Sequence, residues 1–127
     1  MLFIQYDKCT TCQRAKKWLD NHAFSYTDRP IKENNPTYEE LKAWYERSGW
    51  PLKRFFNTSG RLYKELGLKE RLPSMSEEEQ LQLLSENGML VKRPLLITDT
   101  VVLVGFRQPA WEAALLTDDT EEQQTDE

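Results

Sequence analysis

The first thirty residues constrain the fold most, because they predict a strand, a helix and a second strand in close succession. "LFIQY" at 2–6 is an apolar run typical of a short strand. Ala15, Trp18 and Leu19 then recur at helical spacing. "FSYTDRPI" predicts a second strand, which Pro30 ends or holds at a sheet edge. Two strands joined by one helix favour a parallel pair with a right-handed crossover.

The middle of the chain predicts helices rather than strands. Thr37 with Glu40 has the spacing of a helix-capping box, and Ser76 with Glu79 repeats it. Between them, "LKRFF" predicts a helical turn and "RLYKELGL" a short helix, separated by the turn-forming "NTSG". We therefore expect a helical insertion over about residues 33–90.

The end of the chain predicts a hairpin and a last helix. "LLIT" and "VVLVGF" flank a "DT" turn, and "PAWEAALL" follows with helical character. The fold predicted for residues 1–116 is one α/β domain, a mixed four-stranded sheet with helices on both faces and the helical insertion. Residues 117–127, "TDDTEEQQTDE", are predicted to form an acidic disordered tail.

Length and charge exclude several classes of protein. The chain has 127 residues and a net charge of −4, without the basic footprint of a nucleic-acid binder. Its apolar runs are too short to span a bilayer, and "MLFIQYDK" lacks the positive start of a signal peptide. We expect a cytoplasmic protein with no direct nucleic-acid partner and no membrane association.

Cys9 and Cys12 are the only cysteines, and they stand between the first strand and the first helix. A thiol attacks as its thiolate, and a helix N-terminus favours that negative charge. Cys9 holds this position if it caps the helix, although Thr10 or Thr11 would serve as caps too. We predict Cys9 as nucleophile and Cys12, one turn further in, as the thiol that resolves its adduct.

The cysteine pair also fits two other interpretations. The two cysteines suit inert apolar packing. They are also half of a zinc site, but zinc takes four ligands and the one histidine, His22, lies about three turns along the same helix. We therefore predict redox chemistry and no metal site.

Arginines are suited to bind an oxyanion substrate, because a guanidinium binds two oxygens at once. Arg93 precedes Pro94 at the start of a predicted strand, an unusual place that suggests a cis bond. Arg107 follows the hairpin, and Arg14 lies within the first helix. For each arginine the alternative is an ordinary solvated surface position.

Four segments together resemble the ArsC/Spx family of thioredoxin-fold proteins: "YDKCTTCQRAKKWLD", "FFNTSGRLYKELGL", "LVKRPLLI" and "VLVGF". The resemblance runs from about residue 1 to 116. It implies a thioredoxin-like sheet, with Cys9 at the position where arsenate reductases of this family carry their nucleophile. It further implies that Arg93 and Arg107 contact the oxyanion and that Pro94 is the cis-proline of the fold.

The resemblance has two departures. Arsenate reductases of this type carry another arginine ahead of "YKELGL", where Phe56 and Asn57 are not basic. The glutathione-coupled reductases also lack a cysteine at the position of Cys12, and the CxxC form is typical of Spx-like regulators and of uncharacterised family members.

The resemblance leaves three functions open. The favoured one is an arsenate reductase-like thiol-disulfide oxidoreductase for a small oxyanion or disulfide substrate. It would hold no bound cofactor and take electrons from an external thiol reductant, namely glutathione, glutaredoxin or thioredoxin. The alternative is a Spx-like redox-switched regulator that binds RNA polymerase. A third reading is a family member that keeps the fold without the chemistry.

Overall fold

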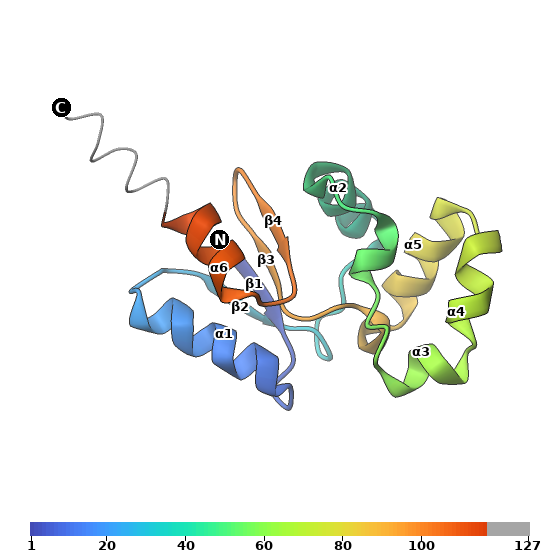
Figure 1. The fold of residues 1–127 in the computed structure, drawn as a ribbon, viewed down its shortest axis with the longest axis horizontal. Helices are drawn as coiled ribbons and strands as arrows, with labels where there is room; N and C mark the ends of the chain where they lie inside the picture. The colour runs from blue at the N-terminus through green and yellow to red at the C-terminus, as the bar shows by residue number, and fades with distance from the viewer. Residues whose placement is uncertain (117–127) are drawn as a thin grey trace.

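The computed structural model describes residues 1–116 and contains one mixed sheet of four strands in the order β2-β1-β3-β4 (Figure 1). The strands are β1 (Leu2–Gln5), β2 (Thr27–Pro30), β3 (Leu95–Ile97) and β4 (Val102–Val104). β1 runs parallel to β2 and antiparallel to β3, and β3 pairs antiparallel with β4. This confirms the predicted fold class, and Pro30 ends the edge strand β2 as expected.

Helices cover both faces of this sheet, because alternate strand residues point to opposite sides. α1 (Thr10–Asn21) and α6 (Gln108–Leu115) pack on the face that carries Phe3 and Leu96. The neighbouring residues Ile4 and Leu95 point to the other face, where the segment between β2 and β3 forms a larger core. Figure 1 shows these two groups of helices on either side of the strands.

The insertion between β2 and β3 is helical, as predicted. It contains α2 (Tyr38–Ser48), α3 (Arg61–Glu65), α4 (Leu68–Arg71), α5 (Glu77–Glu86) and 3-10 turns at Leu52–Phe55, Leu72–Ser74 and Gly88–Leu90. Both predicted capping boxes form, Thr37 with Glu40 and Ser76 with Glu79. Gly67, at φ 63°, separates α3 from α4 because a left-handed residue interrupts the helical backbone.

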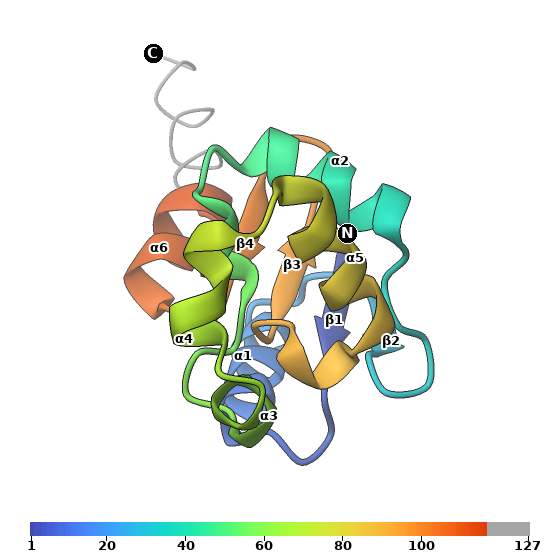
Figure 2. The same ribbon diagram turned by 90° about the vertical axis from the view of Figure 1, so that its right-hand side faces the viewer.

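Backbone contacts fix the insertion against the segment that enters β3. Phe56 pairs with Val91 in an antiparallel bridge, and the Lys92 N–H donates to the Phe55 carbonyl at 2.8 Å. The Asn57 N–H donates to the Leu90 carbonyl at 2.7 Å. Figure 2 shows the insertion, with α3, α4 and α5, on the side of the molecule nearest the viewer. These bonds place the segment after Pro51 beside the residues that precede β3.

An ion pair ties the sheet edge to the insertion. Arg29 of β2 donates to both carboxylate oxygens of Glu40 on α2, each at 2.8 Å. A bidentate pair of this kind fixes orientation as well as distance.

Two further expectations from the sequence concern the acidic tail and membrane-spanning helices. The predicted acidic tail at 117–127 lies outside the described residues. No helix within residues 1–116 has the length and apolar character to cross a membrane.

Candidate functional site

Cys9 is the N-cap of α1, which settles the three capping candidates in its favour. Its backbone is extended, at φ −93° and ψ 116°, and its Sγ accepts a hydrogen bond from the Cys12 N–H at 3.3 Å. The Cys9 N–H donates to the Tyr6 carbonyl at 3.0 Å, which closes the turn between β1 and the helix. Cys9 is partly exposed. Its sulfur therefore sits where the helix leaves backbone N–H groups unpaired.

Cys12 lies beneath Cys9 and is almost fully enclosed, with 1% of its surface exposed. Burial raises the pKa of the Cys12 thiol from 9.0 to about 12, and its contact with Cys9 adds to this rise, while the charge of Arg93 opposes it. Both cysteines are free thiols in the structure. Cys12 is therefore held protonated, close to the Cys9 sulfur and away from solvent.

Arg93 is anchored next to this pair. Its peptide bond to Pro94 is cis, and its Nη1 donates to the Met89 and Val91 carbonyls at 3.3 Å each. The guanidinium carbon lies 5.2 Å from the centroid of the Tyr6 ring. The buried Nε has no acceptor among the described residues. A buried donor without an acceptor costs roughly 1–3 kcal/mol, so the placement of this guanidinium carries a cost to stability.

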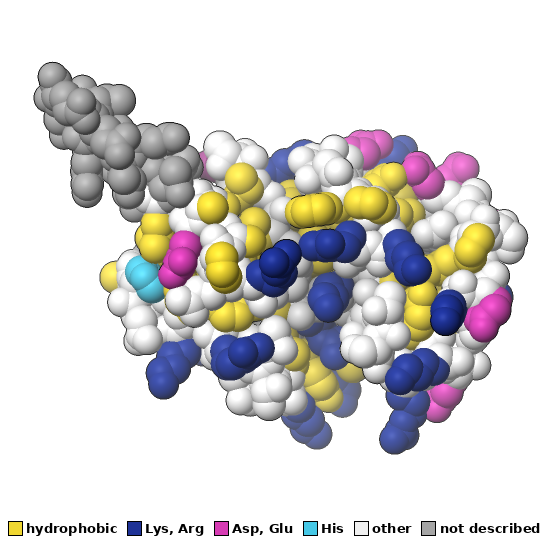
Figure 3. Space-filling view, viewed as in Figure 1, with side chains coloured by type: hydrophobic (Ala, Val, Ile, Leu, Met, Phe, Trp, Pro, Cys, Tyr) yellow, Lys and Arg dark blue, Asp and Glu magenta, His cyan; other side chains and the backbone are white. Residues whose placement is uncertain are grey.

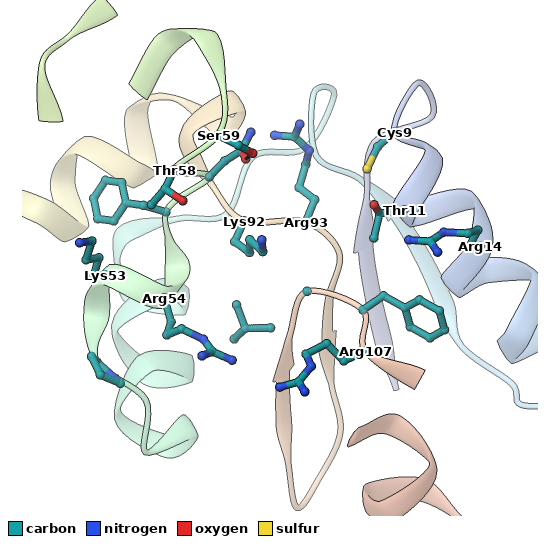
Figure 4. A pocket seen from close by; sticks show the side chains of 16 residues that line it. Cys9, Thr11, Arg14, Lys53, Arg54, Thr58, Ser59, Lys92, Arg93 and Arg107 are labelled. Atoms are coloured by element: carbon teal, nitrogen blue, oxygen red, sulfur yellow. Dashed lines mark hydrogen bonds between the residues drawn. The ribbon is translucent and has the colours of Figure 1, made fainter. Parts of the chain in front are cut away.

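Cys9 opens into a cleft of about 820 Å³ between the sheet and the insertion. Figure 4 shows Cys9, Thr11 and Arg14 on one wall, and Lys53, Arg54, Thr58 and Ser59 on the opposite wall. Lys92, Arg93 and the loop from Gly105 to Arg107 complete the lining. The site is thus built from four stretches of chain that are distant in sequence.

The lining of the cleft is strongly basic. It contains six cations and no acidic residue: Arg14, Lys53, Arg54, Lys92, Arg93 and Arg107. The ion pairs found within residues 1–116, Lys16 with Asp28 and Arg29 with Glu40, lie elsewhere. Figure 3 shows dark blue side chains gathered over the middle of this face. A cleft lined by one sign of charge attracts and concentrates anions.

Net charge conceals this feature of the molecule. All 17 basic residues precede position 117, whereas six of the 21 acidic residues fall in 117–127. The first 116 residues therefore hold 17 basic and 15 acidic side chains, a balance of +2.

The structure brings most of the predicted site residues together. Cys9, Arg14, Arg93 and Arg107 line the cleft, while Cys12 lies below its surface. Pro94 is not part of the lining, but it joins Arg93 to β3. The roles of these residues remain predictions, because position alone does not assign chemistry.

Among the polar lining residues, sequence reasoning missed three cations and three hydroxyl side chains: Lys53, Arg54, Lys92, Thr11, Thr58 and Ser59. The "LKRFF" segment gave a signal, since two adjacent cations stood just before the non-basic Phe56 and Asn57. The insertion thus supplies positive charge from positions upstream of the expected one. Within residues 1–116, no group of three histidine, cysteine or acidic side chains is placed to hold a metal ion.

The fold and the site define a thioredoxin-like protein that carries a cysteine pair at the start of its first helix. A Bacteroides fragilis crystal structure, described as related to the ArsC family, matches it with 59% identity and a TM-score of 0.85, over 87% of this chain and 93% of that chain. The structure of a possible arsenate reductase from Streptococcus mutans shares 45% identity and a TM-score of 0.79, over 84% and 91%.

Sequence comparison gives the same family. The pattern of the ArsC family matches residues 4–114, and the chain belongs to this family. Bacillus subtilis YusI is 53% identical over 112 residues, which are 88% of this chain and 95% of YusI. The regulatory protein MgsR of Bacillus subtilis is 29% identical over 106 residues, 84% of this chain and 82% of MgsR. The family thus includes relatives named as enzymes and as regulators.

Proposed function

We propose that this chain is an arsenate reductase-like thiol-disulfide oxidoreductase of the cytoplasm, where thiols are kept reduced. The observation that carries the proposal is the stacking of one accessible and one enclosed thiol at the mouth of a cationic cleft. Cys9 faces the cleft from the N-cap of α1, and Cys12 lies buried one turn further along the helix. This is the order in which a nucleophile and a resolving thiol must act.

The chemistry proceeds in two displacements. The Cys9 thiolate attacks a substrate disulfide, forms a mixed disulfide and expels one thiolate, which takes a proton from water. Cys12 then loses its proton and attacks the Cys9 sulfur, which closes the Cys9–Cys12 disulfide and releases the second thiol. Two electrons pass from the cysteine pair to the substrate. An external thiol, from thioredoxin, glutaredoxin or glutathione, restores the dithiol.

Arsenate fits the same two displacements. Cys9 attacks arsenic and displaces hydroxide, which leaves as water after protonation. Cys12 attacks the Cys9 sulfur, and the arsenic–sulfur electron pair leaves with arsenite. Arg93 and Arg107 would hold the oxyanion, and Arg14 of α1 lines the same cleft. The position of Arg93 in the cleft lining, together with Cys9, supports this assignment.

The test is turnover of arsenate and of hydroxyethyl disulfide by the purified protein, with each of the three reductant systems in turn. Cys9→Ser is expected to abolish both reactions. Cys12→Ser is expected to stop after one event and to retain a mixed disulfide that mass spectrometry detects. Thr10→Ser, at an exposed neighbour outside the cleft lining, serves as the matched control. Full turnover by Cys9→Ser would end the proposal.

The relationship to MgsR supports a second candidate, a redox-switched regulator that binds RNA polymerase. Here the cysteine pair would change a binding surface instead of turning over a substrate. A pull-down of purified RNA polymerase by the oxidised and the reduced protein separates the two candidates. Binding that depends on the cysteine state, without turnover of either substrate, would favour the regulator.

A further inference from the structure

We propose that the wall of the cleft formed by the insertion is a second anion subsite, which selects small disulfides carrying an acidic group remote from the reacting sulfur. The inference rests on the proposed function and names the substrate class of the same site. Lys53 and Arg54 form this subsite, which we call the distal subsite, and Lys92 lies between it and Cys9 (Figure 4).

Arg54 is positioned to bind and is not otherwise occupied. Its guanidinium carbon lies 4.2 Å from the centroid of the Trp50 ring, which supports one face and leaves the edges free. Trp50 is 43% exposed, an unusual position for a tryptophan that makes no contribution to either core. Within residues 1–116 neither Lys53 nor Arg54 has an acidic partner. Stacking reduces the freedom that Arg54 loses when it binds an anion.

The size of the cleft argues against a simple oxyanion as its only occupant. Water takes roughly 30 Å³ in the liquid, so an oxyanion of five heavy atoms fills on the order of 100 Å³. The cleft has about 820 Å³, which lies within the ~300–1,000 Å³ of pockets for larger ligands. An oxyanion held by Arg93 beside Cys9 would leave the distal subsite unfilled. A disulfide with remote carboxylates or phosphates would reach both.

In this reaction the remote anion stays bound while the sulfur reacts. The Cys9 thiolate forms the mixed disulfide with the substrate half that the distal subsite holds, and the other half leaves as a thiolate. Cys12 then displaces the bound half as a second thiolate, and an external dithiol reduces the resulting Cys9–Cys12 disulfide.

The kinetic test compares three disulfides: glutathione disulfide with remote carboxylates, coenzyme A disulfide with phosphates, and uncharged hydroxyethyl disulfide. Dithiothreitol is the common reductant. We expect the protein to prefer one or both anionic disulfides. Lys53→Gln with Arg54→Gln should lower kcat/KM for the preferred anionic disulfide about 10- to 100-fold, as expected for lost charge-assisted contacts, and leave hydroxyethyl disulfide within about twofold. The anionic disulfide whose kcat/KM falls in this double variant shows whether the distal subsite prefers carboxylates or phosphates.

A matched control removes the same charge elsewhere. Lys64→Gln with Lys69→Gln takes two positive charges from exposed positions on α3 and α4 that do not line the cleft. Both double variants should retain the unfolding temperature of the parent, since all four side chains are exposed. An equal loss of anionic-disulfide activity in both double variants would assign the effect to general charge and overturn the subsite.

A binding measurement keeps the inference separate from the proposed function. S-methylglutathione carries the carboxylates of glutathione but has no thiol to exchange, and desulfo-coenzyme A does the same for the phosphates. We expect one of them to protect Cys9 from iodoacetamide in the parent and in the control, and not in Lys53→Gln with Arg54→Gln. This result would support the subsite even without turnover.

Three further results would overturn the distal subsite. Protection by neither probe is one, and equal kcat/KM for charged and uncharged disulfides is another. The third is protection only by an acidic polypeptide such as polyglutamate, which would assign the cleft to a macromolecule. In the second case turnover that requires Cys9 would leave the proposed function standing.

Discussion

The enclosed thiol gives the sharpest quantitative prediction, because its reactivity follows from its pKa. At a pKa of 9.0 about one thiol in a hundred is ionised at pH 7, whereas at about 12 the fraction is about one in 100,000. Only the thiolate is alkylated. Cys12 should therefore react with iodoacetamide about a thousandfold more slowly than an unperturbed thiol, and its 1% exposure slows the reaction further.

The assay is peptide-resolved mass spectrometry of the reduced protein during alkylation at pH 7. Cys12 is followed in the parent and in Cys9→Ser, so that label on Cys9 cannot shield it. The same proteins in concentrated urea provide the control, because unfolding removes the burial that is the largest cause of the raised pKa. We expect Cys12 to regain the rate of a free thiol under those conditions.

Labelling of native Cys12 within tenfold of the urea rate would refute the reasoning. It would mean that the thiol is ionised or reached by solvent far more often than its surroundings in the structure allow. The division of labour between the two cysteines would then lose its physical basis.

Two further predictions concern pH. The rate at which Cys12 resolves the Cys9 adduct should rise about tenfold per pH unit between pH 6 and 8, because the thiolate fraction of Cys12 rises tenfold per unit far below its pKa. Stopped-flow measurement of the release of the second thiol gives this rate. A rate that does not change with pH would contradict the prediction. Arg29 lowers the pKa of Glu40 from 4.5 to about 2, so this pair's contribution to stability is complete above about pH 5 and is lost as the pH falls towards 2. Because the Glu40 side chain is 35% exposed, solvent screening limits the stability that Glu40→Gln loses to about 1–2 kcal/mol at pH 7. Urea unfolding of the parent and the variant at pH 7 and pH 3 measures this difference. A difference in stability that grows in acid would contradict the prediction.

Local signals explain why the fold was predictable. Capping boxes at Thr37 and Ser76 act within four residues, and both formed where the spacing predicted. Strand limits were less accurate. The second strand was expected over 24–31 but covers Thr27–Pro30, because β1 offers only four partners, from Leu2 to Gln5. The length of a paired strand depends on both strands, so the sequence of one strand does not determine it.

The candidate site was predictable except for the wall that the insertion forms. Cys9 and Arg93 belong to short motifs whose chemistry is visible in sequence, and the structure places both in the cleft. Lys53 and Arg54 are exposed cations, and their adjacency in "LKRFF" is a weak signal because it does not say which surface they face. They face the cleft because the Lys92–Phe55 hydrogen bond and the Phe56–Val91 bridge dock the insertion there. Such a long-range contact leaves no periodic trace in the sequence.

This construction allows chemistry and specificity to change independently. The sulfur pair stands at the start of α1, where moving Cys9 would disturb the helix cap and the core around Cys12. The side chains of Lys53 and Arg54 instead point from a short 3-10 turn whose buried residues, Leu52 and Phe55, hold it in place. Exposed substitutions away from such anchors usually change stability by less than about 0.5 kcal/mol. The insertion therefore provides a wall whose charge can change without cost to the fold, opposite a thiol pair that cannot move.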